Sequence, residues 1–239
     1  MSPRQVPTAR LPQDFPAGVG STSVGELRII RHDGFVPYQE AWDEQRRLHA
    51  ARVAGEIGDT VVLLEHEAVY TAGKRTTPEE RPLLDAGAPV IDVDRGGKIT
   101  WHGPGQLTGY PILQLPEPYD VIGYVRRVEQ LMLDVCHDLG VDAVRVDGRS
   151  GVWIQPGDGS PDRKLGAVGL RVARGVTMHG FALNCDNDLG WYDRIVACGI
   201  SDAGTTTLSR ELGRRVSVAD ALPYVEGHLD ELLALQPQT

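Results

Sequence analysis

The chain has 239 residues, of which 24 are Lys or Arg and 33 are Asp or Glu, and its formal net charge is −9. This length fits one large or two small domains with a sizeable core, and the acidic balance argues against broad nucleic-acid binding. No apolar run approaches a membrane span, and the N-terminus lacks the apolar core of a signal peptide. The three cysteines are widely spaced and odd in number, so we expect a cytoplasmic protein without a disulfide framework.

The first 25 residues and the remainder of the chain differ in composition. Residues 1–25 are rich in Pro, Gly, Ser and Thr without periodicity, which predicts a flexible N-terminal extension. Residues 26–239 show no internal repeat and no clear linker, so we predict a single domain. Strands are predicted over residues 27–30, 60–65, 90–93, 98–101, 107–115, 141–146, 151–155, 164–173, 176–178 and 181–184.

Three helices are predicted from apolar spacing and from end signals. The first runs from Tyr38 to Val53. The second follows Asp120 as N-cap and ends at Gly140, and the third follows Ser217, with Pro223 predicting a kink or a later start. Short strands joined by turns, together with three helices, indicate an α+β fold with a mixed, largely antiparallel sheet flanked by helices.

Residues 95–106 read Arg-Gly-Gly-Lys-Ile-Thr-Trp-His-Gly-Pro-Gly-Gln, two glycine turns around a short β-like run. Glycine lets the backbone pass close to a ligand, and these turns carry Arg95, Lys98 and His102. Side-chain chemistry on a glycine-rich frame is typical of a ligand-facing loop. His102 either hydrogen-bonds within a site or anchors the loop, and the sequence leaves both readings open.

Three further stretches complete a pattern. Residues 164–169 read Lys-Leu-Gly-Ala-Val-Gly, residues 179–184 read His-Gly-Phe-Ala-Leu-Asn, and residues 197–200 read Ala-Cys-Gly-Ile. In this order the motifs closely resemble the octanoyltransferases of lipoate biosynthesis, within the biotin/lipoate protein ligase superfamily. The resemblance covers about residues 27–233. It implies that residues 26–239 form a catalytic domain of the biotin/lipoate ligase-like fold with a small C-terminal subdomain, whose boundary would fall near Asp186.

The resemblance assigns Cys198 and Lys164 as the catalytic pair. A nearby cation favours the reactive thiolate form of a cysteine, and a lysine beside apolar neighbours is expected to be partly desolvated, which suits it to carry protons. From the residues alone, a surface lysine and a buried cysteine remain the alternative. The resemblance also implies an acyl-binding wall made of Arg95, Gly96, Gly97, Lys98, Ile99, Thr100, Trp101, His102, Ala167, Val168, Gly169, Gly180, Phe181 and Ala182.

The implied reaction moves an octanoyl group from octanoyl-acyl-carrier protein to a specific lysine of a lipoyl domain through a Cys198 thioester. The implied acceptors are the lipoyl domains of 2-oxoacid dehydrogenase complexes and the glycine cleavage H protein. Thioester exchange is near neutral and amide formation is downhill, so no ATP, metal or other cofactor is expected. The chain has neither a Walker-type motif nor Cys-x-x-Cys. No nucleic-acid or membrane partner is expected.

Other readings remain open at this point. An ATP-dependent lipoate–protein ligase would share the fold and a lysine at position 164, and it needs no nucleophilic cysteine. A non-catalytic acyl-binding protein and a cysteine hydrolase are further alternatives. Because acyl carrier proteins and lipoyl domains are usually acidic, an acidic transferase would need a basic patch. One candidate, or equally a solvated face, comprises Arg145, Arg149, Arg163, Lys164, Arg171 and Arg174.

The remaining titratable candidates receive structural interpretations. Cys136 falls on the apolar stripe of the second helix, which predicts burial as a small hydrophobe. Cys185 lies between Asn184 and Asp186, and nearby negative charge disfavours a thiolate, so we assign it no catalytic role. His66 is interpreted as a hydrogen-bonded structural histidine.

Overall fold

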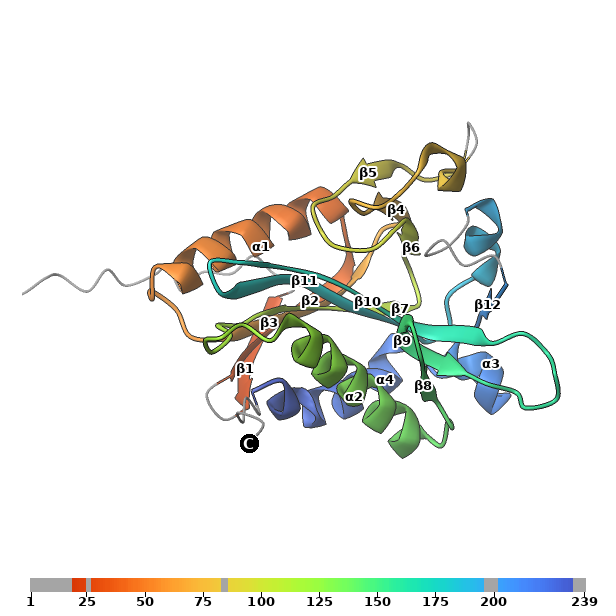
Figure 1. Ribbon diagram of the computed structural model, residues 1–239. Coiled ribbons are helices and arrows are strands. Elements are labelled where there is room, and N and C mark those ends of the chain that lie inside the picture. The colour runs from red at the N-terminus through yellow and green to blue at the C-terminus, as the bar shows by residue number, and fades with distance from the viewer. Residues whose placement is uncertain (1–18, 25–26, 83–85, 196–201, 234–239) are drawn as a thin grey trace, which may run out of the picture.

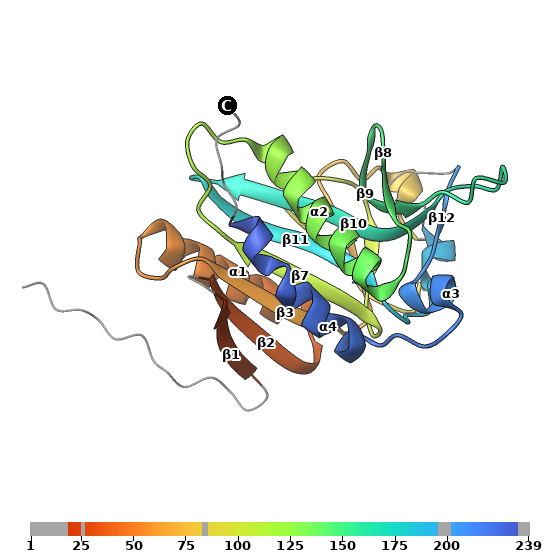
Figure 2. The same ribbon diagram turned by 90° about the horizontal axis from the view of Figure 1, so that it is seen from below.

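The computed structural model describes residues 19–24, 27–82, 86–195 and 202–233. A large mixed sheet forms the middle layer (Figure 1). Helix α1 and a small second sheet lie on one side of it, and helices α2 and α4 cover the opposite face (Figure 2). In this part of the chain, no helix combines the length and hydropathy needed to cross a bilayer.

The helices and strands have the following bounds. The helices are α1 (Tyr38–Val53), α2 (Val121–Leu139), α3 (Leu208–Leu212) and α4 (Val218–Gly227), with 3-10 turns η1 (Pro78–Glu80), η2 (Leu189–Arg194) and η4 (Leu229–Leu232). The strands are β1 (Val19–Val24), β2 (Leu27–Val36), β3 (Thr60–His66), β4 (Val69–Ala72), β5 (Val90–Asp92), β6 (Thr100–His102), β7 (Gln106–Ile112), β8 (Val144–Val146), β9 (Arg149–Ile154), β10 (Arg163–Ala173), β11 (Val176–Asn184) and β12 (Gly204–Thr205).

The large sheet has the order β1-β2-β3-β7-β11-β10-β9-β8, with β12 pairing to β10, and the small sheet has the order β5-β4-β6. The pairs β2–β3, β10–β12 and β4–β5 are parallel and the others are antiparallel. The predicted α+β class with a mixed, largely antiparallel sheet is therefore confirmed.

The core lies on both faces of the large sheet because successive side chains along its strands point to opposite faces. In β3, Val61 and Leu63 pack into the cluster shared with α2 and α4, whereas Val62 and Leu64 pack on the opposite face with Ala41 of α1. This period of two is the geometry of an extended strand. Both faces of the sheet are therefore covered.

The helix ends follow from local capping chemistry. The Asp120 side chain accepts from the Gly123 amide at 2.7 Å, and Gly140 ends α2 in the left-handed region with φ 87°. The predicted bounds of α1 and α2 are confirmed. Helix α4 begins directly after its Ser217 cap and contains Pro223, so of the predicted kink or later start, the later start does not occur.

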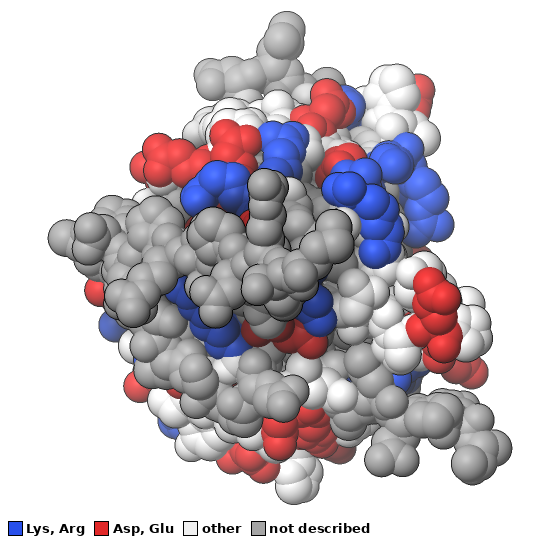
Figure 3. Space-filling view, turned by 90° about the vertical axis from the view of Figure 1, so that its left-hand side faces the viewer, with Lys and Arg blue, Asp and Glu red and all other residues white. Residues whose placement is uncertain are grey.

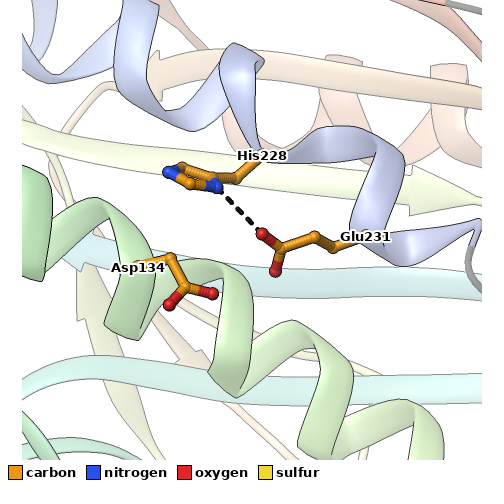
Figure 4. Close-up of side chains that lie close together, drawn as sticks. All are labelled: Asp134, His228 and Glu231. Carbon is orange, nitrogen blue, oxygen red and sulfur yellow. Dashed lines mark hydrogen bonds and ion pairs between the residues drawn. The ribbon is translucent and has the colours of Figure 1, made fainter.

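His228 and Glu231, at the C-terminal end of the described chain, lie close to Asp134 of α2 (Figure 4). His228 contacts Asp138 through Nε2 at 2.9 Å and Glu231 through Nδ1 at 2.8 Å, and Asp134 lies beside them. Partial burial favours the neutral ring, but the two carboxylates raise the pKa of His228 above its ordinary value. The charged imidazolium is thus the form that this contact stabilises.

Three expectations differ from the structure. Residues 19–24 pair with β2 as strand β1, so the flexible extension predicted for residues 1–25 is wrong for that segment, while residues 1–18 lie outside the described part. Residues 176–184 form one strand instead of two. In the described residues beyond Asp186, no separate sheet forms: β12 joins the large sheet and α4 packs on α2.

Candidate active site

A cavity of about 250 Å³ lies against strands β10 and β11. Residues of the large sheet, the second sheet, α1 and the β8–β9 turn all contribute to its wall. The lining residues are Tyr38, Arg75, Arg95, Gly97, Lys98, Thr100, His102, Thr108, Tyr110, Gly148, Arg149, Ser150, Lys164, Ala167, Val168, Gly169, His179, Gly180, Phe181 and Ala182. Most of the residues proposed for an acyl-binding wall thus meet around one space together with Lys164.

Three of the proposed wall residues do not line this cavity. Ile99 and Trp101 flank Thr100 on alternating positions, so their side chains pack instead into a cluster with Tyr70 and Tyr192. Gly96 is held by its amide, which donates to the Leu170 carbonyl at 3.1 Å. The sequence pattern marked the right segment but not which of its alternating residues face inward.

Arg95 fastens the glycine turn to the second sheet. Its guanidinium donates to the carbonyls of Gly96 and Lys98, both at 2.9 Å, and to the carbonyl and hydroxyl of Thr71 at 2.7 and 2.8 Å. A Cβ on Gly73 would stand 2.8 Å from an Arg95 nitrogen and 2.5 Å from the Gly97 oxygen. Gly73 therefore permits a close approach that no larger residue would allow.

Lys164 lies on β10, where strands β9 and β12 flank it. It pairs with Trp153 on one side and with Thr205 on the other, and it is 8% exposed. No carboxylate of the described residues lies within ion-pair distance of its ammonium. The lysine also lines a smaller adjoining cavity of about 30 Å³, bordered by Thr205 and Asn184. Lysine is rarely buried without a charged partner, so a buried lysine that lines two cavities is a candidate functional residue.

Cys198 belongs to residues 196–201, which lie outside the described residues. The chain that follows this segment runs alongside Lys164: Thr205 is its β-partner, and the Thr206 amide donates to the Lys164 carbonyl at 2.9 Å.

A hydrogen-bonded chain links the sequence motifs. The side-chain oxygen of Gln106 accepts from His102 Nδ1 at 2.7 Å, and its nitrogen donates to Asn184 at 2.9 Å. Asn184 in turn donates to the Thr206 carbonyl at 3.0 Å. Since an amide oxygen only accepts, Nδ1 of His102 carries the hydrogen, and Nε2 of the neutral ring is an acceptor. His102 both anchors its loop and lines the cavity, so the two readings of this residue do not exclude each other.

Neutral histidine and tyrosine rings lie in the cavity wall and directly behind it, beside α1 and β7. His66 donates from Nδ1 to the Val36 carbonyl at 2.8 Å and accepts from the Tyr110 hydroxyl at 2.6 Å, which fits its predicted structural role. Burial lowers the pKa of His66 to about 4 and that of His102 well below its ordinary value, while burial raises the pKa of Tyr38 to about 12. These groups are therefore uncharged at neutral pH.

Sequence reasoning missed a second histidine of the cavity wall. His179 adopts a left-handed conformation with φ 56°, and its amide donates to the side chain of Gln45 on α1 at 2.9 Å. Its Nε2 donates to Asp94 at 2.7 Å, and this hydrogen bond lowers the pKa of Asp94 to about 2. The motif His-Gly-x-Ala-x-Asn contained the residue, but only the long-range contacts show where it points.

The cavity glycines also bring strands together. A Cβ on Gly180 would meet the Gly109 carbonyl oxygen at 2.3 Å, and one on Gly109 would meet the Phe181 ring at 2.3 Å. At Gly180, one of the proposed wall residues, the missing side chain therefore serves strand packing.

The two described cysteines are free and buried. Burial raises the pKa of Cys136 to about 12 and that of Cys185 above its ordinary value, so both are held as thiols. The predicted burial of Cys136 is confirmed.

The candidate basic patch does not form a free cationic surface. Arg163 pairs with Glu211 at 2.9 Å, Arg149 with Asp202 at 2.5 Å, Arg145 with Glu129 at 3.4 Å, and Arg171 with Asp94. Acidic and basic side chains likewise lie next to one another on the face seen in Figure 3. Most of the positive charge of the candidate basic patch is therefore neutralised by carboxylates of the protein itself.

Comparison with known proteins identifies the class. The model of the lipoyl protein ligase A/B catalytic domain matches residues 37–230, and the chain belongs to this family. It is 64% identical to an octanoyltransferase of Salinispora tropica, over 89% of this chain and 99% of that protein. It is 62% identical to an octanoyltransferase of Thermobifida fusca, over 83% of this chain and 85% of that one. Within the family, the chain groups with the octanoyltransferases.

Solved structures show the same fold at low identity. A bi-partite lipoate protein ligase from Thermoplasma acidophilum superposes with a TM-score of 0.65 at 15% identity, covering 90% of this chain and 85% of that one. A lipoate-protein ligase A bound with ATP superposes with a TM-score of 0.61 at 14% identity, covering 80% and 81%.

Proposed function

We propose that the protein transfers an octanoyl group from octanoyl-acyl-carrier protein to a lysine of lipoyl domains through a thioester on Cys198. The observation that carries this proposal is Lys164, a buried cation at the cavity without a carboxylate partner among the described residues. The strand beside it leads directly from the segment that contains Cys198. A lysine so placed can hold a thiolate and exchange protons with reacting groups.

The reaction divides into two balanced steps. The Cys198 thiolate attacks the thioester carbonyl carbon of the donor, the bond from that carbon to the pantetheine sulfur breaks, and the leaving thiolate takes a proton from the Lys164 ammonium to become the free thiol. The amine of the acceptor lysine then attacks the acyl-enzyme, an amide forms, and the Cys198 thiolate leaves. Lys164 receives the proton that the amine releases, which restores the starting pair. No nucleotide is consumed.

The cavity suits an uncharged acyl chain. Along β10, Lys164 and Gly169 are five residues apart, which corresponds to about 17 Å at roughly 3.4 Å per residue. The wall includes the apolar Ala167, Val168 and Ala182, and His102 and Tyr38, which also line the cavity, are neutral. At roughly 0.8 kcal/mol per buried CH₂, an octanoyl tail would contribute about 5 kcal/mol to binding.

Intact mass spectrometry tests the proposal directly. After incubation with octanoyl-acyl-carrier protein, the protein is expected to gain one octanoyl group, and a lipoyl domain or glycine cleavage H protein should then acquire it. Cys198→Ser should lose the stable thioester, while Cys136→Ser, a change at a buried thiol, serves as the matched control. An adduct that persists on Cys198→Ser would refute the assignment. Transfer that requires ATP and free octanoate would indicate a ligase instead.

A further inference from the structure

We propose that Trp153 is a positioning residue for Lys164, holding the lysine ammonium against its ring face where the thioester reaction takes place. The inference rests on the proposed function and extends it to a residue outside the wall of the larger cavity. Trp153 lies on β9 directly opposite Lys164, and both side chains are buried, at 1% and 8% exposure.

The contact between the two residues is a cation–π interaction. The Lys164 Nζ stands 4.7 Å from the centroid of the Trp153 ring, within the roughly 6 Å over which a ring face attracts a cation. This attraction is largest where water is excluded, and among the aromatic side chains tryptophan gives the strongest interaction. In the described part of the chain, Lys164 has no salt bridge, so the ring is its electrostatic support there.

The same ring faces a second cation. The Arg149 guanidinium carbon lies 5.5 Å from the Trp153 centroid, and Arg149 pairs with Asp202 at 2.5 Å. Asp202 is the first described residue after 196–201. The Trp153 ring therefore contacts both Lys164 and the arginine that pairs with Asp202.

The polar atom of Trp153 does not explain the presence of this side chain. The indole Nε1 is buried without a hydrogen-bond partner. A buried donor left unpaired is unfavourable. The favourable polar contact of this side chain is therefore made by the ring face, which lies against the Lys164 ammonium, and not by the N–H group. A phenylalanine would keep a face and remove the unpaired donor.

Paired substitutions of similar volume separate this role from packing. Trp153→Phe keeps an aromatic face, whereas Trp153→Met fills comparable space without one. We expect both variants to melt at similar temperatures. With octanoyl-acyl-carrier protein and a lipoyl domain, Trp153→Met should lose about 10- to 30-fold in kcat with KM for the donor changed less than twofold. Trp153→Phe should stay within about threefold of the parent protein.

The outcomes are distinguishable from those of the proposed function. If the unsubstituted protein forms no acyl-enzyme and transfers nothing, the proposed function fails. If it is active and the Phe and Met variants show equal kcat, the positioning role of Trp153 is overturned. Should the Met variant fail to fold, the pair Trp153→Tyr and Trp153→Leu provides the same comparison of ring against aliphatic side chain, with the same expected ranking.

Discussion

Glu129 offers a stability test whose magnitude follows from its surroundings. This carboxylate on α2 is fully buried, and it accepts from the Gly151 amide at 2.7 Å and from Arg126 at 2.8 Å, with Arg145 at 3.4 Å. Glu129→Ala leaves two arginines without their anion and the Gly151 amide without an acceptor. The side chains of Arg126 and Arg145 are 46% and 32% exposed, so water can solvate them once Glu129 is gone, and the main cost is the buried Gly151 amide left without an acceptor, about 1–3 kcal/mol. At about 2–4 °C per kcal/mol for a protein of this size, we expect Tm to fall by about 6 °C.

Thermal denaturation followed by circular dichroism measures this change. Glu129→Gln retains an acceptor for the Gly151 amide and should fall between Glu129→Ala and the parent protein. Glu56, exposed after α1, provides the control: Glu56→Ala should change the unfolding free energy by less than about 0.5 kcal/mol. If Glu129→Ala melts within 2 °C of the parent, a loss of no more than about 0.5–1 kcal/mol, the buried carboxylate does not hold the β8–β9 turn and the reasoning is refuted.

Three further predictions concern other parts of the chain. The pKa of His228 is raised in the folded state, so its contribution to the free energy of unfolding is fully present below the unfolded-state pKa of about 6.5 and is lost as pH rises through the folded-state pKa. His228→Gln should therefore lower the urea midpoint at pH 5.5 but not at pH 9, and equal losses at both pH values would contradict this. Gly180→Ala should destabilise by about 1–3 kcal/mol because its methyl would meet a carbonyl, whereas Gly227→Ala, with no atom within 4 Å, should not; similar Tm values would count against the close approach. Lys164→Arg keeps the charge but cannot release a proton, so octanoyl transfer should fall about 10²- to 10⁴-fold, nearly as far as in Lys164→Ala; near-normal transfer by the arginine variant would leave the lysine as a fixed charge only.

Local signals predicted the helices well because their determinants are local. Asp120 and Gly140 set both ends of α2 through contacts within a few residues, and the apolar stripe of that helix identified Cys136 as buried. The strand over residues 176–184 was divided in the prediction because glycine at 180 weakens a strand pattern. Its continuity comes from pairing with β10 and β7, which composition does not reveal.

The candidate site was predictable as a set of motifs but not as a set of contacts. Glycine-rich spacing and resemblance located Lys164 and the loop of Arg95. They did not locate Trp153 or Asp94. Trp153 meets Lys164, 11 residues away in the chain, through the register of two paired strands, and Asp94 meets His179, 85 residues away, through a hydrogen bond. Arg149 and Arg163 fit a basic surface in the sequence, which does not show that Asp202 and Glu211 pair with them in the fold.

Those partnered arginines have a consequence for how the C-terminal part of the chain opens. Arg31–Glu226, Arg149–Asp202 and Arg163–Glu211 each join residues 202–226 to an earlier strand of the large sheet. These pairs are partly exposed, and added salt screens such pairs over a Debye length of about 8 Å at 0.15 M and about 3 Å at 1 M. Added salt should therefore raise the frequency of sub-global opening in this segment, so that deuterium exchange of its amides accelerates more with salt than exchange of the β3 and β7 amides, because the described residues of those two strands form no salt bridge.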